Sequence, residues 1–173
     1  MQEMVVYGVS FDMVGKQPIV LLKTVATNRF LPIWIGHPEA AAILARLQDS
    51  ETPRPMTHDL FSAALKEMDA EVVKISVVEM KDSTFFAKIT LQRDGSEIEL
   101  DARPSDAIAL ALRAKAPIYA ADDVIEESAI QMEDESSEAA TSADPEQLVE
   151  DFKQFLEDVQ PDEFGSDDEP ETT

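Results

Sequence analysis

Apolar and polar residues alternate along much of the chain, as they do in strands that bury one face. The first such stretch covers residues 4–12. The side chains that share its expected inner face are Val5, Tyr7, Val9 and Phe11. Further strands are expected over 19–23, 30–35, 73–77, 85–91, 98–100 and 117–120. Residues 93–96 hold the Asp-Gly pair that two-residue turns favour, so they predict a hairpin between the strands on either side.

Apolar residues at helical spacing predict three main helices, each with a start signal. The first covers 38–47, and the third covers 103–116. Because residues 107–112 are apolar all round, we expect the third helix to be deeply buried. The second helix begins with Thr57 as its cap. Its apolar stripe consists of Leu60, Phe61, Ala64, Leu65 and Met68. Residues 122–127 predict a short helix or turn.

The composition changes near residue 130, which we take as the end of a main domain, residues 1–130. Residues 131–143 are acidic and rich in Ser and Ala, so they predict a linker. Residues 144–160 predict an amphipathic helix, and 161–173 predict an acidic disordered tail. The apolar stripe of this helix must dock on the domain or on a neighbour. It consists of Leu148, Phe152, Phe155, Leu156 and Val159.

Charge is distributed unevenly along the 173 residues, of which 44% are apolar and 29% charged. The net charge is −22. Residues 1–130 hold 20 acidic and 13 basic residues, a net of −7, whereas 131–173 hold 16 acidic residues and one basic residue, a net of −15. An acidic surface repels phosphate backbones at long range, which argues against a general nucleic-acid binder.

The chain shows no sign of export or of a membrane span. No apolar run approaches the roughly 18 residues that cross a bilayer. Residues 1–4 lack a basic region followed by an apolar stretch. Cysteine is absent, which removes disulfides, thiolate metal sites and cysteine nucleophiles. These features predict a cytoplasmic protein that has no membrane partner.

Candidate chemistry is confined to a few places, since phosphate-binding loops, dinucleotide-binding glycines and nucleophile elbows are missing. The segment from Arg54 to Asp59 presents a cation, the His58 imidazole and a carboxylate at a helix entrance. This arrangement could bind an anion or a metal, with His58 as an acid–base group. The spacing alone favours simple capping by Thr57, with Asp59 serving the helix dipole.

A second helix entrance combines Arg103, Ser105 and Asp106. Free N–H groups and a guanidinium at such a place could bind a phosphate. A local ion pair between Arg103 and Asp106 explains the same residues equally well.

A third candidate is a row of carboxylates at period two, which places them on one face of a strand. The row consists of Glu97, Glu99 and Asp101. Converging carboxylates can hold a divalent cation, but such a row is more often a solvated face. Glu39, early in the first helix, could contribute to a cation site as well.

Six motifs occur in order over roughly residues 3–130: LPIWIG (31–36), EAAAI (39–43), RPMTHDL (54–60), DSTFFA (82–87), RPSDAIALA (103–111) and API (116–118). Together they resemble the bifunctional nuclease family. The segment FKQFL (152–156) is similar to the short C-terminal helix of many bacterial members. Two departures stand out: Ala102 replaces a common Ser, and His37-Pro38 replaces small or acidic residues.

The resemblance implies an α+β domain with a strongly bent, mainly antiparallel sheet packed by helices. It also implies a homo-oligomer, expected to be a dimer, and cleavage of both RNA and DNA. If the domain is such a nuclease, Arg54, Arg103 and Ser105 hold the scissile phosphate and His58 acts as acid or base. The carboxylates would bind a divalent metal such as magnesium or manganese or would orient water. They are Asp59, Asp106 and Glu39.

Two other readings remain open. In the first, the domain is a non-catalytic, oligomeric module that binds a ligand or protein, and its polar motifs cap helices and link subunits. The acidity of the chain supports this reading. In the second, the acidic tail mimics nucleic acid and covers the cationic site of its own chain.

Overall fold

The computed structural model describes residues 1–12, 15–50 and 52–131. These belong to one compact unit, Met1–Met132. The predicted helix 144–160, the predicted tail 161–173 and all but the first residue of the predicted linker 131–143 lie outside the described residues. The proposed docking of the helix therefore stays a prediction.

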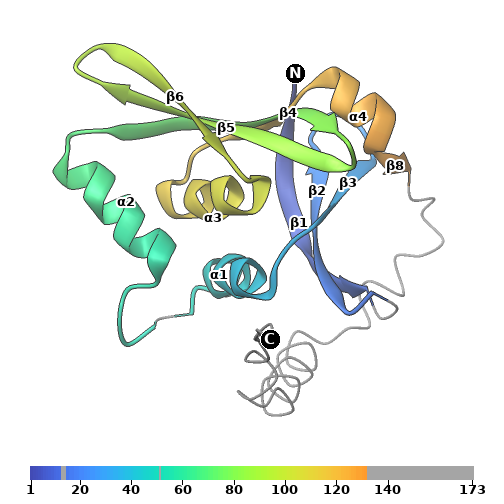
Figure 1. The fold of residues 1–173 in the computed structure, drawn as a ribbon, viewed down its shortest axis with the longest axis horizontal. Helices are drawn as coiled ribbons and strands as arrows, with labels where there is room; N and C mark the ends of the chain where they lie inside the picture. Colours follow the sequence, from blue (N-terminus) through green and yellow to red (C-terminus); the bar gives the residue numbers. More distant parts are fainter. Residues whose placement is uncertain (13–14, 51, 132–173) are drawn as a thin grey trace, which may run out of the picture. The chain divides into compact units, whose positions relative to one another are not determined.

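A single mixed sheet forms the framework of the described part of the chain (Figure 1). Its strands are β1 (Gln2–Asp12), β2 (Gln17–Thr24), β3 (Arg29–Trp34), β4 (Glu71–Lys81), β5 (Thr84–Arg93), β6 (Ser96–Ala102), β7 (Ile118–Ala120) and β8 (Ile130–Gln131). Their order is β6-β5-β4-β7-β1-β2-β3-β8, and the one parallel pair in it is β4 with β7. Figure 1 shows β1–β3 running steeply across the direction of β4–β6, so the sheet is strongly bent. The predicted α+β fold with a mainly antiparallel sheet is confirmed.

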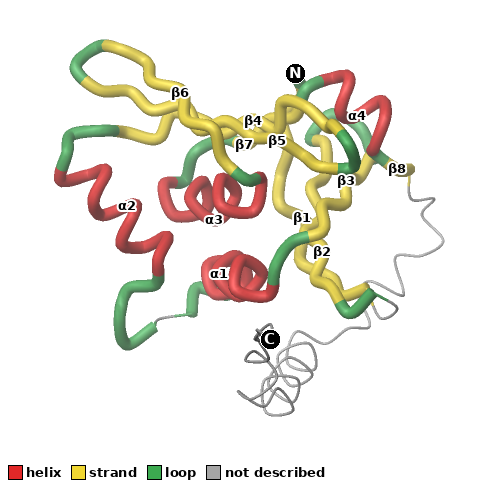
Figure 2. Tube along the Cα trace, in the orientation of Figure 1, coloured by secondary structure: helices red, strands yellow, loops and turns green. Residues whose placement is uncertain are grey.

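Helices α1, α2 and α3 lie in the angle of the bent sheet (Figure 2). Their bounds are His37–Leu47 for α1, Thr57–Glu67 for α2 and Pro104–Ala114 for α3. Helix α4 (Asp122–Ser128) lies outside this angle and contacts β3 and β4. Helix α3 packs on β4 and β5, α1 packs on β1 and β2, and α1 and α2 both contact α3. Among the described residues, no helix combines the length and the apolar character that crossing a membrane requires.

Helix α3 lies at the centre of the core, as its all-apolar sequence predicts. Residues 107–111 are each at most 1% exposed. Burying side chains the size of Ile108 and Leu110 contributes about 1.5–3 kcal/mol each. The small alanines between them let α1 and the sheet approach the helix on several sides at once.

Tight turns fix the register of the β4–β5–β6 meander. Asp94 and Gly95 both have positive φ, 51° and 77°, as a two-residue turn of the primed type requires. Arg93 pairs with Ser96 across this turn, so the predicted hairpin is confirmed. Asp82 and Ser83 make the equivalent turn between β4 and β5.

The expected inner face of β1 is wrong for its first half. Val5 and Tyr7 are 47% and 49% exposed, whereas Met4 is 2% exposed. The pairing of β1 with β2 shifts register between Val6 and Gly8, which is a bulge. A bulge breaks the period of two. Alternation therefore puts even-numbered side chains inward before it, and Val9 packs against the core after it.

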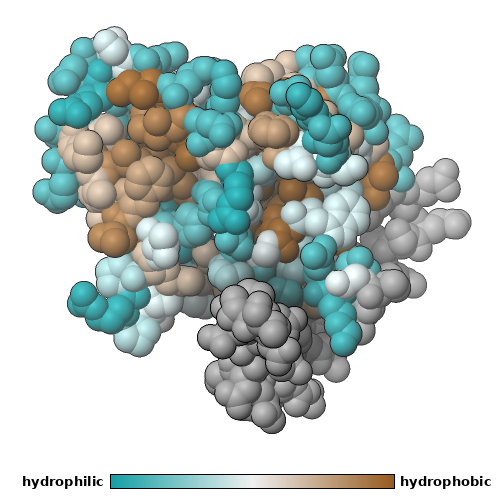
Figure 3. All heavy atoms as spheres, in the orientation of Figure 1, coloured by the Kyte–Doolittle hydropathy of each residue, from teal (hydrophilic) through white to brown (hydrophobic). Residues whose placement is uncertain are grey.

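The expected stripe of α2 is also largely exposed. Leu65 is buried, but Leu60, Phe61 and Met68 are 65%, 39% and 53% exposed. The helix packs on α3 through one narrow edge and leaves an outer apolar surface. We call this surface the α2 face, defined by Leu60, Phe61, Ala64 and Met68. Figure 3 shows apolar side chains gathered over α2 and the neighbouring β5–β6 hairpin.

Candidate functional site

Three helices begin close together, and each carries an acidic residue at its third position. These residues are Glu39 in α1, Asp59 in α2 and Asp106 in α3. Free N–H groups give a helix start a partial positive charge, so carboxylates are stabilised there. Local sequence therefore explains why an acidic residue occupies this position in each helix. It does not determine which cationic side chain each carboxylate pairs with.

Arg103 bridges two of these acids. It stands immediately before α3, and its Nε lies 2.7 Å from Oδ2 of Asp106. Its second guanidinium nitrogen lies 2.8 Å from Oε1 of Glu39. The first pair is local, whereas the second joins the starts of α1 and α3 across 64 positions of sequence.

His58 joins the same group from α2. Its Nε2 lies 3.0 Å from Oδ1 of Asp106, so the two oxygens of this carboxylate serve different partners. The His58 side chain is 13% exposed. We call the set Glu39, His58, Arg103 and Asp106 the arginine network.

Charge fixes the ionisation of this network. Burial acts to raise the pKa of Asp106, but hydrogen bonds from Arg103 and His58 and the charge of Arg103 outweigh it, so its pKa lies below the usual value. The hydrogen bonds to Asp106 and Glu39 raise the pKa of Arg103. Asp106 is therefore a carboxylate and Arg103 a cation at neutral pH.

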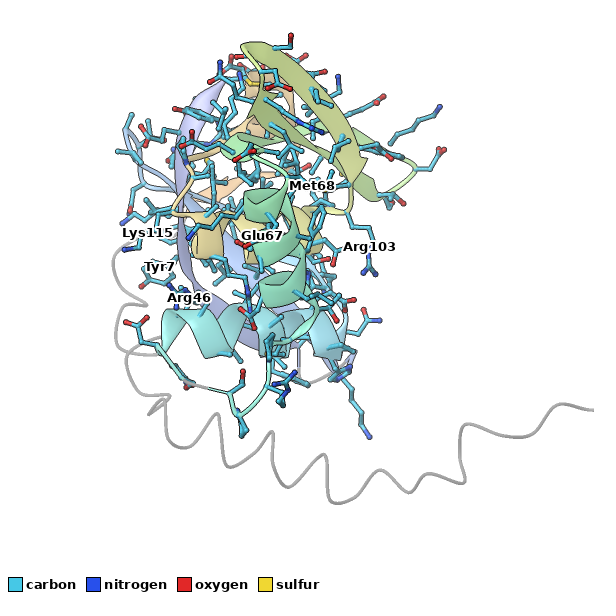
Figure 4. The ribbon with its side chains drawn as sticks, turned by 90° about the vertical axis from the view of Figure 1, so that its left-hand side faces the viewer. Tyr7, Arg46, Glu67, Met68, Arg103 and Lys115 are labelled. Atoms are coloured by element: carbon cyan, nitrogen blue, oxygen red, sulfur yellow. The ribbon has the colours of Figure 1, made fainter. Side chains whose placement is uncertain are left out.

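Arg103 nevertheless stays open to solvent. Its side chain is 66% exposed, against 15% for Glu39. Figure 4 shows Arg103 projecting outward on the side of the molecule opposite to Tyr7. The carboxylates of Glu39 and Asp106 thus bind the guanidinium on one side. Its solvent-exposed side remains available to an anion.

A hollow of about 380 Å³ opens beside Arg103. Trp34 and Gly36 line it from the end of β3, Phe85 lines it from β5, and Arg103 and Ser105 line it from the start of α3. Trp34 is 53% exposed, and Ser105 is 6% exposed. An exposed aromatic ring, a cation and a buried hydroxyl residue therefore share one depression.

The Glu39 carboxylate closely approaches Gly36. A Cβ at position 36 would lie 2.2 Å from Oε2 of Glu39, so a side chain there would displace this carboxylate. The Glu39 carboxylate folds back over the glycine and from there reaches Arg103. The glycine before α1 thus helps to set the position of one carboxylate in the arginine network.

Asp59 belongs to a second cluster. Its Oδ2 accepts from the Met56 N–H at 2.9 Å, and its Oδ1 accepts from Nε of Arg113 at 2.6 Å. Met56 is the cap residue of α2, so Thr57 is the first helical residue and not the cap that the sequence predicted. Burial acts to raise the pKa of Asp59, but the hydrogen bonds from Arg113 and Met56 and the nearby charges lower it overall.

Arg113 is the residue that sequence reasoning missed. Its side chain is 6% exposed, and it also donates to the carbonyl oxygens of Ala42 and Ala109 at 3.1 and 2.9 Å. It therefore ties α1, α2 and α3 together. One signal in the sequence could have identified it. Arg113 is the charged residue near the end of an otherwise apolar helix, and a charge buried there needs a partner of opposite charge.

Arg54 stands apart from both clusters. It is exposed in the loop before α2, and within the described ranges it forms no ion pair. Asp59, five residues further along, pairs with Arg113 and not with Arg54. The structure thus brings together Glu39, His58, Arg103 and Asp106 and leaves Arg54 and Asp59 outside that group.

The row of carboxylates on β6 lies on a solvated face. Glu97, Glu99 and Asp101 are all exposed. Glu99 pairs with Lys88 on the neighbouring strand at 2.6 Å, and this pair is open to water. The row has the geometry of an ordinary charged strand surface.

Comparison with known proteins then decides the family. The family model described as "Bifunctional nuclease domain" matches residues 20–133. The chain belongs to the bifunctional nuclease domain family. An uncharacterized protein of Mycobacterium tuberculosis is 40% identical over 164 residues, which cover 95% of this chain and 98% of that protein.

Plant relatives align with this bifunctional nuclease domain over a shorter range. "Bifunctional nuclease 1" of Oryza sativa subsp. japonica is 30% identical over 110 residues, 62% of this chain and 33% of that protein. "Bifunctional nuclease 1" of Arabidopsis thaliana is 30% identical over 103 residues, 58% of this chain and 32% of that protein. The aligned part thus spans about a third of the plant proteins.

A divalent metal was one expectation for this bifunctional nuclease domain. The described ranges contain no group of three or more His, Asp or Glu side chains placed to share a metal ion. Glu39 and Asp106 point toward a common place, but the guanidinium of Arg103 already bonds to both. The residues present fit a cationic side chain between these carboxylates and do not fit a preassembled metal centre.

Proposed function

We propose that this domain hydrolyses phosphodiester bonds of RNA and DNA at the arginine network. One observation carries the proposal: an exposed guanidinium is held by two carboxylates, and one of these also holds an imidazole. Guanidinium groups bind phosphate through paired N–H donors, and imidazoles transfer protons near neutral pH. Membership of the family and the printed names of the plant relatives support the same reaction class.

In this proposal Arg103 binds the scissile phosphate and balances the negative charge that grows on it as water attacks. The bond from phosphorus to the attacking oxygen forms, and the bond to the leaving oxygen breaks. The attacking water gives up one proton, and the leaving oxygen takes one up. Ser105, which lines the adjacent hollow, is a further phosphate contact.

His58 is the proposed proton carrier. Asp106 is ionised and can only accept a hydrogen bond, so Nε2 of a neutral His58 carries the ring proton. Nδ1 is then the nitrogen that holds a lone pair and can take a proton from water. Asp106 would act as a positioning residue for both His58 and Arg103, and Glu39 would do the same for Arg103 alone.

The structure supports different roles for Arg54 and Asp59. Arg54 is exposed and lies two residues before the cap of α2, so it remains a proposed outer contact for phosphate. The bonds of Asp59 to Arg113 and Met56 support a structural role for Asp59. We therefore do not place Asp59 in the reaction.

The test is a nuclease assay on the purified full chain with end-labelled RNA and DNA, with and without added magnesium and a chelator. Arg103→Ala and His58→Gln should each lower the rate at least 100-fold, as for removal of other transition-state contacts. Arg93→Ala is the matched control, because Arg93 is an exposed, paired arginine on a distant hairpin. Equal activity in all of these variants would show that the cleavage comes from elsewhere or from a contaminant.

A non-catalytic binding module is the second candidate. Its supporting observation is that every charged member of the arginine network already has a partner of opposite charge, as a purely structural cluster would. In that case Arg103→Ala would change stability or ligand binding, and no variant would change hydrolysis.

We further propose a homodimer that forms through the α2 face. The support is the exposure of Leu60 and Phe61 on α2 and of Met68 at its C-terminal cap, since large apolar surfaces of this kind usually mark an interface. A cytoplasmic location also remains a prediction.

A further inference from the structure

The hollow beside Arg103 contains an exposed indole that the fold does not use. Strand β3 buries Phe30, Leu31 and Ile33, but its last residue, Trp34, is 53% exposed. Within the described ranges, the Trp34 ring makes no hydrogen bond and no contact with another ring. About half of the indole surface is therefore available to a molecule that enters the hollow.

Ser105 gives a second, independent indication. Its side chain is 6% exposed and lines the same hollow. Its hydroxyl forms no hydrogen bond within the described residues, and the oxygen is not fully enclosed. It therefore reaches the solvent of the hollow, where it can donate to or accept from a molecule that enters.

The size of the hollow limits what can enter. At about 380 Å³ it lies at the small end of ligand sites, which start near 300 Å³. One nucleotide has a flat aromatic base and an anionic phosphate, which match Trp34 on one side and Arg103 with Ser105 on the other. A duplex does not match, because its bases are stacked on one another and hidden from a protein ring.

We propose that this hollow is a subsite for one unpaired nucleotide of a single strand, with the base stacked on Trp34 and its phosphate held by Arg103 and Ser105. The proposal rests on the proposed function and narrows its substrate class to single-stranded RNA or DNA. Trp34 is then a specificity-determining residue, and it takes no part in proton transfer.

The chain offers a direct probe, because Trp34 is its one tryptophan. Intrinsic fluorescence of the full chain is measured at low salt during titration with four probes. These are an eight-nucleotide single strand, an abasic strand with the same number of phosphates, a duplex of the same sequence, and a free nucleoside monophosphate. A base stacked on the indole should quench emission saturably with the first probe and much less with the abasic strand and the duplex. Equal quenching by the abasic strand or the duplex would overturn the proposal. A monophosphate that binds as tightly as the strand would show a free-nucleotide site instead.

Variants test the same contact by affinity, measured as anisotropy of a labelled strand. Trp34→Ala should weaken binding about tenfold, within the range known for one base stacked on an aromatic ring, and Trp34→Phe should recover most of the loss. Tyr7→Ala is the matched control, since Tyr7 is 49% exposed and lies on the side of the molecule opposite to Arg103 (Figure 4). Thermal melting checks that each variant is folded, and the titration of the unaltered chain decides the question if Trp34→Ala is not. Unchanged affinity in folded Trp34→Ala would refute the subsite.

The two proposals fail separately. Quenching by the single strand without any cleavage would leave the subsite standing and remove the hydrolytic function. Cleavage that is unchanged in Trp34→Ala, with no quenching, would leave the nuclease standing and remove the subsite.

Discussion

Arg103 and Arg113 lie at opposite ends of α3, and their charges have very different surroundings. The Arg113 side chain is 6% exposed, and it bonds to Asp59 and to two carbonyl oxygens. The Arg103 side chain is 66% exposed, although two carboxylates hold it. A buried arginine that satisfies backbone acceptors serves the fold, whereas an exposed one held in a fixed orientation can serve a ligand.

Replacing Arg113 should therefore cost stability. Arg113→Ala leaves Asp59 and the carbonyl of Ala42 without their partner, and we expect a loss of about 1–3 kcal/mol in the free energy of unfolding. The Asp59 side chain is 35% exposed and keeps its bond from the Met56 N–H, so the loss stays below that of a fully buried pair. Urea unfolding followed by circular dichroism measures it. The control Arg93→Ala should change stability by less than about 0.5 kcal/mol, and a similar result for Arg113→Ala would refute the structural role.

Acid should weaken the fold through Asp59 and Asp106. Both have a pKa below the usual value in the folded state. The unfolded chain therefore takes up these protons first as pH falls, which favours unfolding. The stabilisation from these two carboxylates is complete above the pKa of an aspartate in the unfolded chain, which is about 4. It is lost as the pH drops through the lower pKa that each has in the folded chain. Urea unfolding between pH 7 and pH 2.5 should show this decline, and Asp59→Asn should make it shallower. An unchanged slope in Asp59→Asn would exclude Asp59 as a source of the pH dependence.

Sequence could predict the local part of this chemistry but not the long-range part. The pair of Arg103 with Asp106 follows from a spacing of three residues at a helix start. The bond of Arg103 to Glu39 spans 64 positions and depends on how α1 and α3 pack. No local pattern determines such packing, and the same limit hid the partner of Asp59.

At the scale of elements, the strands and the centre of the core followed from periodicity. Asp94-Gly95 marked the hairpin, and the all-apolar run marked α3 as the buried helix. Periodicity gave the wrong buried face for two elements. The bulge in β1 reverses which side chains point inward, and α2 has an apolar stripe that meets solvent along most of its length.

The exposed α2 face yields a prediction about assembly. Two copies of the chain should pair through it, so Leu60→Lys combined with Met68→Lys should convert a dimer into a monomer without unfolding it. Both side chains are more than half exposed, at 65% and 53%, so lysine adds little strain to the monomer. Sedimentation velocity measures the mass, and circular dichroism checks the fold. The control is Val25→Lys, an exposed apolar position in the loop between β2 and β3. A monomer before any substitution, or a dimer that survives the double change, would contradict this assignment.

At the scale of the whole molecule, charge opposes the proposed substrate. The chain carries −22, and the last 43 residues supply −15 of it. A strand of nucleic acid must approach Arg103 against this field, and such repulsion is strongest at low ionic strength. We therefore expect the acidic residues 131–173 to weaken binding of nucleic acid by the domain.

A chain shortened to end at Met132 should accordingly bind single-stranded nucleic acid more tightly than the full chain. Its net charge is −7 instead of −22, and all the described strands and helices are retained. The gain should be greatest near 20 mM salt and should disappear as screening shortens the range of the field to a few ångströms near 1 M. Anisotropy titrations of a labelled strand at several salt concentrations measure both effects, and circular dichroism confirms the fold of the shortened chain. Arg103→Ala in the shortened chain separates the two sources of a gain. If the shortened chain binds the strand more tightly because less charge repels it from the arginine network, this substitution should abolish most of the added affinity. Equal or weaker binding by the folded, shortened chain would show that the acidic residues do not oppose the ligand.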